Sequence, residues 1–324
     1  MKVMDILLAT DNNFTLPTGV LMTSISLNSG EPVRYHILVD DAFTVENREK
    51  ILREAEHFGN EAHFYCISAD QLKQFPIGRE DMPGHVSLSA YNRLFVTEFL
   101  PADVHKILYL DGDITVRKSL KPLWDEDLTG LALGVVHDMS EKRHVDSGRL
   151  PYPAEYGYFN SGVLLINLDY WREHDCFNRF IDCVREDNAI IKMHDQDVLN
   201  FVLYAEKKWL PLTYNFQAGF LFDCPEMIEF TPDWNEEIRS IERDPAVIHY
   251  CGWSKPWNRA CMHPQRFVWE YYKPKGTFKD AVCPEKLTLR EILSFFVRKN
   301  NYWFGEHHWD SVHRNIYRRV IIRK

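Results

Sequence analysis

The fold of this chain is decided by the stretch Lys106-Ile-Leu-Tyr-Leu-Asp-Gly-Asp-Ile-Thr-Val116. An apolar run rich in strand-forming residues ends in two aspartates, Asp111 and Asp113. Side chains at positions i and i+2 of an extended segment point to the same side, so both carboxylates can bind one cation. Gly112 between them has no Cβ and lets a ligand approach the backbone closely. A divalent cation held by carboxylates is suited to binding a diphosphate.

Position distinguishes this Asp-x-Asp triplet from the two others, at residues 125–127 and 195–197. Aspartate favours turns, so the ordinary interpretation of such a triplet is a solvated turn. The triplet at 111–113 directly follows an apolar strand-like run. Because α/β folds place ligand sites at the carboxyl ends of strands, it is the strongest candidate for a binding site.

Composition narrows the class of protein. The 324 residues are 45% apolar and 26% charged, which fits a globular protein with a sizeable core. A net charge of −9 argues against a general nucleic-acid binder. The seven cysteines include no Cys-x-x-Cys pair, which favours a reducing compartment. The first ten residues lack the apolar core of a signal peptide, and no apolar stretch reaches roughly 18 residues, so we expect a cytoplasmic protein.

Strand and helix patterns alternate along most of the chain. Strands are predicted at residues 6–9, 33–39, 62–67, 106–110, 131–136, 163–167 and 247–250. Helices are predicted at residues 16–27, 44–58 with Thr44 as the N-cap, 89–99, 171–184 and 197–204. This alternation predicts an α/β fold with a mostly parallel sheet over residues 1–262. Residues 263–324 are rich in aromatic and basic residues and are expected to form a small helical appendage.

Polar residues follow several of these strands. Asp11, Asn13 and Phe14 come after the first strand and can hold a base and a ribose, although an ordinary turn would look similar. Asn160 and Ser161 precede an apolar strand and can bind sugar hydroxyls, with a tight turn as the alternative. The chain contains neither a Gly-x-Gly-x-x-Gly fingerprint nor a P-loop, which disfavours a Rossmann dinucleotide site and excludes a P-loop nucleotidase.

Two later stretches add candidate ligands. In the stretch at residues 194–197, Asp197 can be the N-cap of a helix, which leaves Asp195 and Gln196 to face a ligand. In the stretch at residues 249–257, His249 ends a short strand and is a candidate third metal ligand. A lone histidine is more often a core residue, but Gly252 and Lys255 follow at three-residue steps, and a lysine can neutralise a phosphate.

Six segments together resemble glycosyltransferase family 8, the retaining group that contains bacterial lipopolysaccharide galactosyl- and glucosyltransferases and glycogenin. They occur in the family's order over residues 5–258, and such an ordered set is highly specific. The segments are Ala9-Thr-Asp-Asn-Asn-Phe14, Ser89-Ala-Tyr-Asn-Arg-Leu94, Tyr109-Leu-Asp-Gly-Asp113, Phe159-Asn-Ser-Gly162, Asp195-Gln-Asp197 and His249-x-x-Gly-x-x-Lys-Pro-Trp257.

The resemblance implies a GT-A fold with one active-site cleft, a UDP-sugar donor and a catalytic Mn²⁺ or Mg²⁺. Carried over residue by residue, it implies a metal site of Asp111, Asp113 and His249. It implies that Ala9, Asp11, Asn13 and Phe14 border the uridine, that Gly252 and Lys255 meet the diphosphate, and that Arg93, Asn160, Asp195 and Gln196 surround the donor sugar. Asp195 and Gln196 are the expected catalytic pair. At Gly112 the family more commonly has alanine or serine, so we expect a looser contact near the ribose.

These implications predict a retaining, metal-dependent glycosyltransferase that moves glucose or galactose from a UDP-sugar to a bacterial surface glycan, with a lipid-linked acceptor as one candidate. A carboxylate and imidazole ligand set favours Mn²⁺ over Mg²⁺. No carboxylate is clearly placed as a nucleophile, which favours same-face attack over double displacement. A catalytically silent nucleotide-sugar-binding protein and a glycogenin-like self-glycosylating protein are the alternatives. A sugar nucleotidyltransferase is disfavoured because residues 9–14 are neither glycine-rich nor basic.

The end of the chain has a different charge from the rest. Residues 297–324 contain seven Lys or Arg against Glu306 and Asp310, a net charge of +5, which leaves −14 for residues 1–296. Aromatic residues are interleaved with these cations. Basic and amphipathic aromatic residues suit an anionic lipid surface, so a peripheral contact with the cytoplasmic face of the membrane is expected. Docking of this segment on protein is the alternative.

Overall fold

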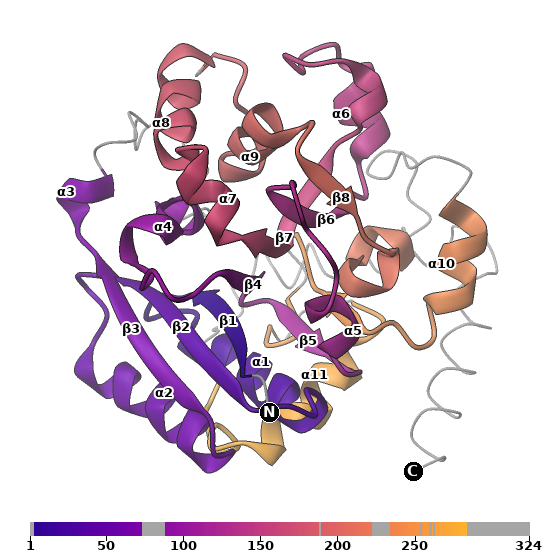
Figure 1. The fold of residues 1–324 in the computed structure, drawn as a ribbon. Helices are drawn as coiled ribbons and strands as arrows, with labels where there is room; N and C mark the ends of the chain where they lie inside the picture. The colour runs from indigo at the N-terminus through magenta and orange to yellow at the C-terminus, as the bar shows by residue number, and fades with distance from the viewer. Residues whose placement is uncertain are drawn as a thin grey trace, which may run out of the picture.

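A seven-stranded sheet forms the centre of the molecule (Figure 1). The computed structural model describes residues 3–72, 88–187, 189–221, 234–252, 255–258, 261 and 263–283. In sheet order the strands are β3 (Glu61–Ile67), β2 (Val33–Asp40), β1 (Met4–Ala9), β4 (Lys106–Leu110), β7 (Phe159–Asn167), β6 (Leu133–His137) and β8 (Lys207–Trp209). β7 runs antiparallel to both of its neighbours, and every other pair is parallel. The predicted α/β class with a mostly parallel sheet is therefore confirmed.

A second, three-stranded sheet was not predicted from the sequence. It contains β5 (Ile114–Val116), β10 (Val247–His249) and β9 (Phe216–Gln217) in the order β5-β10-β9. β5 begins directly after Asp113 and pairs antiparallel with β10, so that Ile114 lies opposite His249. The strand predicted at residues 247–250 corresponds to β10, whereas β5 and β9 were missed because strands of three and two residues leave too little alternation in the sequence.

Helices cover both faces of the central sheet over its inner strands. Ile6 and Leu8 of β1 pack in one core with α1 (Thr15–Asn28) and α2 (Val45–His57), whereas Leu7 points into the core on the opposite face. The opposite core is covered by α4 (Val96–Phe99), α7 (Leu168–Glu173), α8 (Cys176–Asp187) and α9 (Asp195–Leu203). Burial on both faces explains why the strands read as continuous apolar runs.

Three predicted helices differ from those observed. Residues 89–99 form a 3₁₀-helix, η2 (Leu88–Phe95), followed by the single α-helical turn of α4. The predicted helix at 171–184 is broken into α7 and α8 near Asp175, whose φ of 48° is incompatible with a continuous right-handed helix. α9 begins at Asp195, two residues earlier than predicted, with His194 at the N-cap.

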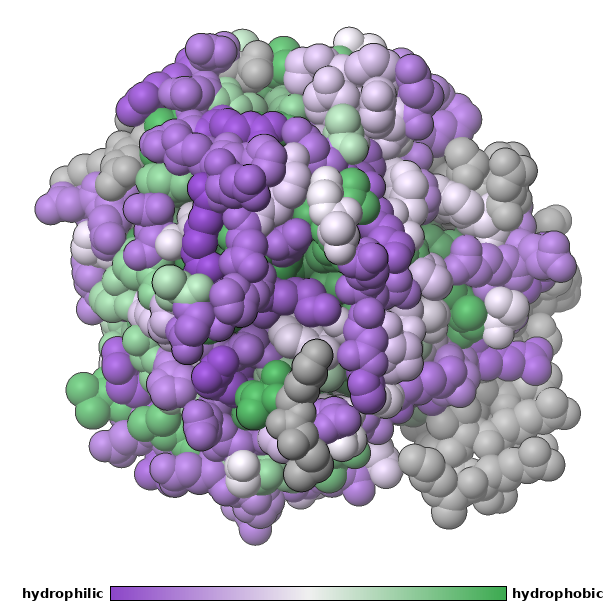
Figure 2. Space-filling view, in the orientation of Figure 1, coloured by the Kyte–Doolittle hydropathy of each residue, from purple (hydrophilic) through white to green (hydrophobic). Residues whose placement is uncertain are grey.

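The remaining helices are short. They are α3 (Ala69–Leu72), α5 (Lys121–Trp124), α6 (Glu141–Asp146), η3 (Ala154–Tyr156), η4 (Leu212–Asn215), η5 (Ala218–Leu221), α10 (Asn235–Ile241), α11 (Arg266–Tyr272) and η7 (Lys273–Lys275). Among the described residues, no helix is long and apolar enough to span a bilayer. Every cysteine that the structure describes is a free thiol. The face drawn in Figure 2 is mainly hydrophilic, with hydrophobic residues in small separate areas.

The first part of the predicted appendage packs on the rest of the molecule. Val268 and Trp269 of α11 share a small core with Val20 of α1 and with Ile248 and Tyr250 at β10. The basic, aromatic segment at 297–324 lies outside the described residues. The domain boundary at residue 262 therefore stays a prediction.

A buried carboxylate ties residues 276–278 to the helices. The Glu54 side chain of α2 has no solvent exposure. It accepts hydrogen bonds from Thr23 Oγ1 at 2.5 Å, Thr277 N at 2.7 Å and Thr277 Oγ1 at 2.6 Å. A buried carboxylate requires such donors, because an unsatisfied charge in the interior is costly.

We expect Glu54→Ala to lower the free energy of unfolding by about 2–3 kcal/mol, since the buried hydroxyl of Thr23 and the amide and hydroxyl of Thr277 lose their acceptor. Glu56→Ala removes an exposed carboxylate from the same helix and is the matched control, with an expected change within about 0.5 kcal/mol. Urea unfolding of both variants measures the difference. Equal stability of the two variants would show that Glu54 does not anchor residues 276–278.

Candidate functional site

Asp111, Asp113 and His249 converge at the end of β4. One potential ligand atom from each residue lies within 4.8 Å of the others. His249 Nε2 is 3.2 Å from Asp113 Oδ1 and 3.8 Å from Asp111 Oδ2. Residues 111–113 form a turn between β4 and β5, so the expectation of an extended segment was wrong, although the two carboxylates do meet. Two carboxylates and an imidazole form a donor set that suits Mn²⁺.

Backbone pairing brings these three residues together. The amide of Asp111 donates to the carbonyl of Gly162 on β7 at 2.9 Å, and the amide of Tyr250 donates to the carbonyl of Asp113 at 2.9 Å. With Ile114 opposite His249 in the second sheet, the histidine is held beside the aspartate turn. The sheet hydrogen bonds therefore fix the site before any ligand binds.

Lys255 provides positive charge beside the carboxylates. Its ammonium forms an ion pair with Asp113 Oδ2 and donates to the carbonyl of Tyr250 at 2.8 Å. Burial disfavours the ionised form of Asp113, but Lys255 and His249 outweigh it and hold the pKa of Asp113 below its usual range. Asp113 is therefore an ionised, acceptor-only group at neutral pH.

The orientation of His249 is set by Asn215, a residue that the sequence analysis missed. Asn215 has no solvent exposure, and its Oδ1 lies 2.9 Å from Nδ1 of His249. An amide oxygen only accepts, so Nδ1 carries a proton and donates to Asn215, and Nε2 is the ring nitrogen that faces the aspartates. The Nδ2 group of Asn215 donates to Asn160 Oδ1 at 2.8 Å.

Arg93 lies buried between the aspartate turn and α9. Its guanidinium is 2.9 Å from Asp111 Oδ1 and 3.2 Å from Asp195 Oδ2, and it donates to the carbonyl of Ser161 at 2.7 Å. The guanidinium also stacks over the ring of Tyr109 at 4.2 Å. Burial opposes the charge on Arg93, but Asp111 and Asp195 outweigh it and raise the pKa of Arg93.

Asp195 and Gln196 lie in the first turn of α9 and face the strand edge. Burial raises the pKa of Asp195 to about 6, against the opposing effect of Arg93. Gln196 Oε1 accepts from Ser161 N at 3.1 Å and from Asn160 Nδ2 at 3.2 Å. The expectation that Asp197 is the N-cap was wrong. It is the third residue of the helix, and its carboxylate accepts hydrogen bonds from the amides of residues 192 and 193.

Asn160 and Ser161 belong to β7 itself, so the tight turn considered as an alternative does not exist there. Both side chains are at least nine-tenths buried. A Cβ at Gly162 would lie 2.3 Å from Cε1 of His249, so the glycine makes room for the histidine ring.

The loop after β1 adjoins the aspartate turn because β1 and β4 are parallel neighbours. Asp11 Oδ1 accepts from the amides of Asn13 and Phe14, both at 2.8 Å, and so shapes the loop. Ala9 is half-buried at the strand end, and Asn13 is exposed. A Cβ at Gly112 would lie 3.2 Å from the Phe14 ring, so the glycine makes room for this aromatic side chain.

Gly252 lies in the loop between β10 and Lys255 and has a φ of 80°. Such a backbone conformation is strained for other residues, which accounts for the glycine without invoking a ligand. Residues 253 and 254 are outside the described residues.

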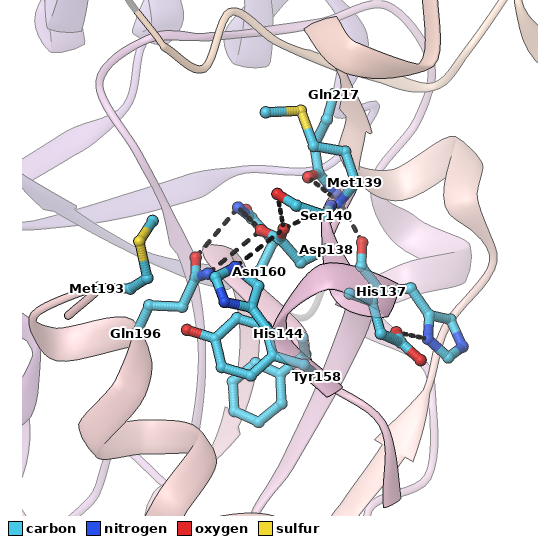
Figure 3. Close-up of polar contacts among 12 residues, drawn as sticks. His137, Asp138, Met139, Ser140, His144, Tyr158, Asn160, Met193, Gln196 and Gln217 are labelled. Atoms are coloured by element: carbon cyan, nitrogen blue, oxygen red, sulfur yellow. Dashed lines mark hydrogen bonds and ion pairs between the residues drawn. The ribbon is translucent and has the colours of Figure 1, made fainter. Parts of the chain in front are cut away.

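Asp138 is the second residue that the sequence analysis missed. It directly follows β6 and is 5% exposed. Its Oδ2 accepts from Asn160 Nδ2 at 3.0 Å and from Gln196 Nε2 at 3.2 Å (Figure 3). Asp138 could have been predicted, because it follows a predicted strand just as residues 111–113 do, and α/β folds place ligand sites at the carboxyl ends of strands. No local sequence pattern marks Asn215.

The family profile described as "Glycosyl transferase family 8" matches residues 5–261. The chain belongs to glycosyltransferase family 8. Three relatives show how closely it resembles other proteins. GlyF of Streptococcus pneumoniae is 28% identical over 91% of this chain, which spans 66% of the length of GlyF.

Two relatives are named for lipopolysaccharide synthesis. The lipopolysaccharide 1,2-glucosyltransferase of Escherichia coli K12 is 25% identical, over 93% of this chain and 85% of the enzyme. The lipopolysaccharide 1,3-galactosyltransferase of Salmonella typhimurium is 24% identical, over 78% of this chain and 73% of the enzyme.

The galactosyltransferase LgtC resembles the chain in structure. In complex with donor and acceptor sugar analogs, LgtC superposes with a TM-score of 0.73 at 29% identity, covering 85% of this chain and 96% of LgtC. An active-site mutant of LgtC, with glutamate in place of a glutamine, gives a TM-score of 0.74. The predicted family, the GT-A fold and the class of glycosyltransferase enzymes are confirmed. The roles of individual site residues stay predictions.

We expect Asn215→Ala to weaken Mn²⁺ binding by about tenfold or more, because His249 loses the acceptor that fixes its tautomer and ring. Asn215→Asp keeps an oxygen near Nδ1 and should bind Mn²⁺ within about threefold of the native chain. Electron paramagnetic resonance of free Mn²⁺ during titration measures both affinities without any substrate. Native affinity in Asn215→Ala would contradict an orienting role for Asn215.

Proposed function

We propose that this protein is a retaining, metal-dependent hexosyltransferase that moves glucose or galactose from a UDP-sugar to a saccharide of a bacterial surface glycan. The observation that carries the proposal is the convergence of Asp111, Asp113 and His249 beside Arg93 and Asp195. Support comes from the lipopolysaccharide glucosyl- and galactosyltransferases among its relatives and from the sugar analogs bound to LgtC.

The donor diphosphate would meet positive charge from two sources. Asp111, Asp113 and His249 would hold a divalent cation, which neutralises the diphosphate and makes UDP a better leaving group. Lys255 lies on the other side of Asp113 and adds a cation that does not depend on the metal. The loop at residues 9–14 lies at the neighbouring strand end, where a uridine attached to that diphosphate would fit.

The donor sugar would lie against Arg93, Asp195, Gln196 and Asn160. Each of these side chains is at least nine-tenths buried and fixed by hydrogen bonds or ion pairs to another member of the site. Such preorganised polar groups orient a sugar without a further entropic cost at the moment of reaction. Gln196 offers an amide at this position, in keeping with the active-site glutamine altered in LgtC.

The surroundings of α9 support same-face attack. Asp195 is paired with Arg93, and Asp197 is paired with Arg149. An amide is a poor nucleophile, so the stretch 195–197 offers no unengaged carboxylate for a covalent intermediate. A catalytically silent binding protein is disfavoured because the full donor set for a cation and the lysine for the diphosphate are present.

Cytoplasmic location and contact of residues 297–324 with an anionic membrane surface are also part of the proposal. A lipid-linked acceptor would explain why such a segment accompanies the catalytic fold. The support is the segregated charge of the sequence alone.

We expect Asp113→Ala to lower the rate of UDP release from UDP-glucose or UDP-galactose by at least about 100-fold, because the diphosphate charge is left unneutralised. We expect the same loss when EDTA is added to the native chain. Asp127→Ala, in an exposed Asp-x-Asp triplet, is the matched control and should retain native turnover. A coupled assay for UDP measures both. Near-native activity of Asp113→Ala in EDTA would refute the metal assignment.

We expect Lys255→Ala to weaken the binding of UDP itself by about fivefold or more, since the lost cation faces the diphosphate and not the sugar. Calorimetry with UDP and Mn²⁺ measures the affinity. Lys121→Ala removes an exposed lysine elsewhere and should leave it unchanged. If UDP bound the two variants equally well, Lys255 would be only a partner of Asp113.

A further inference from the structure

Next to the residues proposed for the donor sugar lies a second group of polar side chains, carried by the loop after β6 and by α6 (Figure 3). The two oxygens of Asp138 have different surroundings. Oδ2 accepts from Asn160 and Gln196, whereas Oδ1 accepts from the amide of Ser140 at 2.8 Å and its hydroxyl at 2.9 Å and faces His144. Asp138 therefore connects the donor-sugar residues with the surroundings of His144 on α6.

The tautomer of His144 is fixed by its neighbour Arg149. An Arg149 nitrogen lies 2.7 Å from His144 Nδ1. Because a guanidinium only donates, Nδ1 accepts, and the proton of the neutral imidazole is on Nε2. Burial lowers the pKa of His144 and keeps the ring neutral near pH 7. The ring also packs on Tyr158, with 4.2 Å between the centroids.

Arg149 is itself held firmly. It forms a bidentate ion pair with Asp197, in which both N–O distances are 2.8 Å. Asp197 has no solvent exposure and also accepts from the hydroxyl of Tyr158. The direction in which His144 presents its Nε2–H is therefore preorganised.

The distance between His144 and Asp138 is long enough for one bridging polar atom. Nε2 lies 4.0 Å from Asp138 Oδ1, too far for a hydrogen bond, and it has no closer polar partner among the described residues. A hydroxyl oxygen about 2.8 Å from each atom fits this gap, accepting from Nε2–H and donating to Oδ1. Sugar hydroxyls are groups that accept and donate together. Met193, 42% exposed, flanks Gln196 nearby and offers apolar surface to a sugar ring.

We propose that His144 binds the acceptor: its Nε2–H and the carboxylate of Asp138 together hold one hydroxyl of the acceptor sugar. The inference rests on the proposed function, since it requires a saccharide acceptor. The acceptor is favoured over the donor because Oδ2 of Asp138 is occupied by Asn160 and Gln196 of the donor-sugar group, whereas Oδ1 and His144 lie beyond them.

Two substitutions of the same histidine distinguish binding from packing. His144→Gln places an amide N–H near the position of Nε2, whereas His144→Asn places its oxygen near Nδ1 and keeps the acceptor for Arg149. Full-length variants are assayed with UDP-glucose and UDP-galactose, with core oligosaccharide released from lipopolysaccharide as the acceptor probe. UDP release without acceptor is measured in parallel.

We expect His144→Asn to raise the acceptor KM about tenfold and His144→Gln to raise it no more than about threefold. Donor hydrolysis without acceptor and donor KM should stay native in both. A native acceptor KM in His144→Asn would overturn the proposal, as would a lower acceptor KM in His144→Asn than in His144→Gln. Equal rises in KM in the two variants, together with a lower melting temperature, would also overturn it. Absence of UDP release by the native chain would instead count against the proposed function.

Discussion

The buried charge of Arg93 is the constraint on which the site depends. A guanidinium with almost no access to water must be neutralised and must place its N–H groups on acceptors. It does so with the carboxylates of Asp111 and Asp195 and the carbonyl of Ser161, which belong to three separate elements. Those two carboxylates would repel each other without the cation. The ion pairs therefore fix α9 relative to the end of β4.

A continuous set of side-chain hydrogen bonds connects the candidate metal ligand His249 to Asp138 and Gln196. It runs from His249 through Asn215 to Asn160, and from Asn160 to both Asp138 and Gln196. Each amide in the set both donates and accepts, so its orientation is dictated by its neighbours. A change at the candidate metal site would thus alter the orientation of Asn160 and Gln196 without any movement of the backbone.

Features that depend on local pattern were predictable from the sequence. The central strands are apolar because both sheet faces are covered, and the Asp-x-Asp triplet is recognisable because it follows such a strand. The pairing of β5 with β10 was not predictable, since it joins three-residue strands more than 130 residues apart in the chain. For the same reason Asn215 escaped notice: its role is defined only by side chains that tertiary structure brings to it. The break at Asp175 depends on one positive φ and likewise leaves no periodic signal.

Asp197 limits what the start of α9 can do chemically. Its carboxylate accepts five hydrogen bonds, two from Arg149, one from Tyr158 and two from the backbone of residues 192 and 193. Burial alone would raise the pKa of Asp197, but these donors outweigh it and lower the pKa. A carboxylate stabilised in this way is a weak nucleophile, and freeing it would leave the half-buried Arg149 without its partner. The structure therefore assigns Asp197 to holding the helix start, which keeps Asp195 and Gln196 in position.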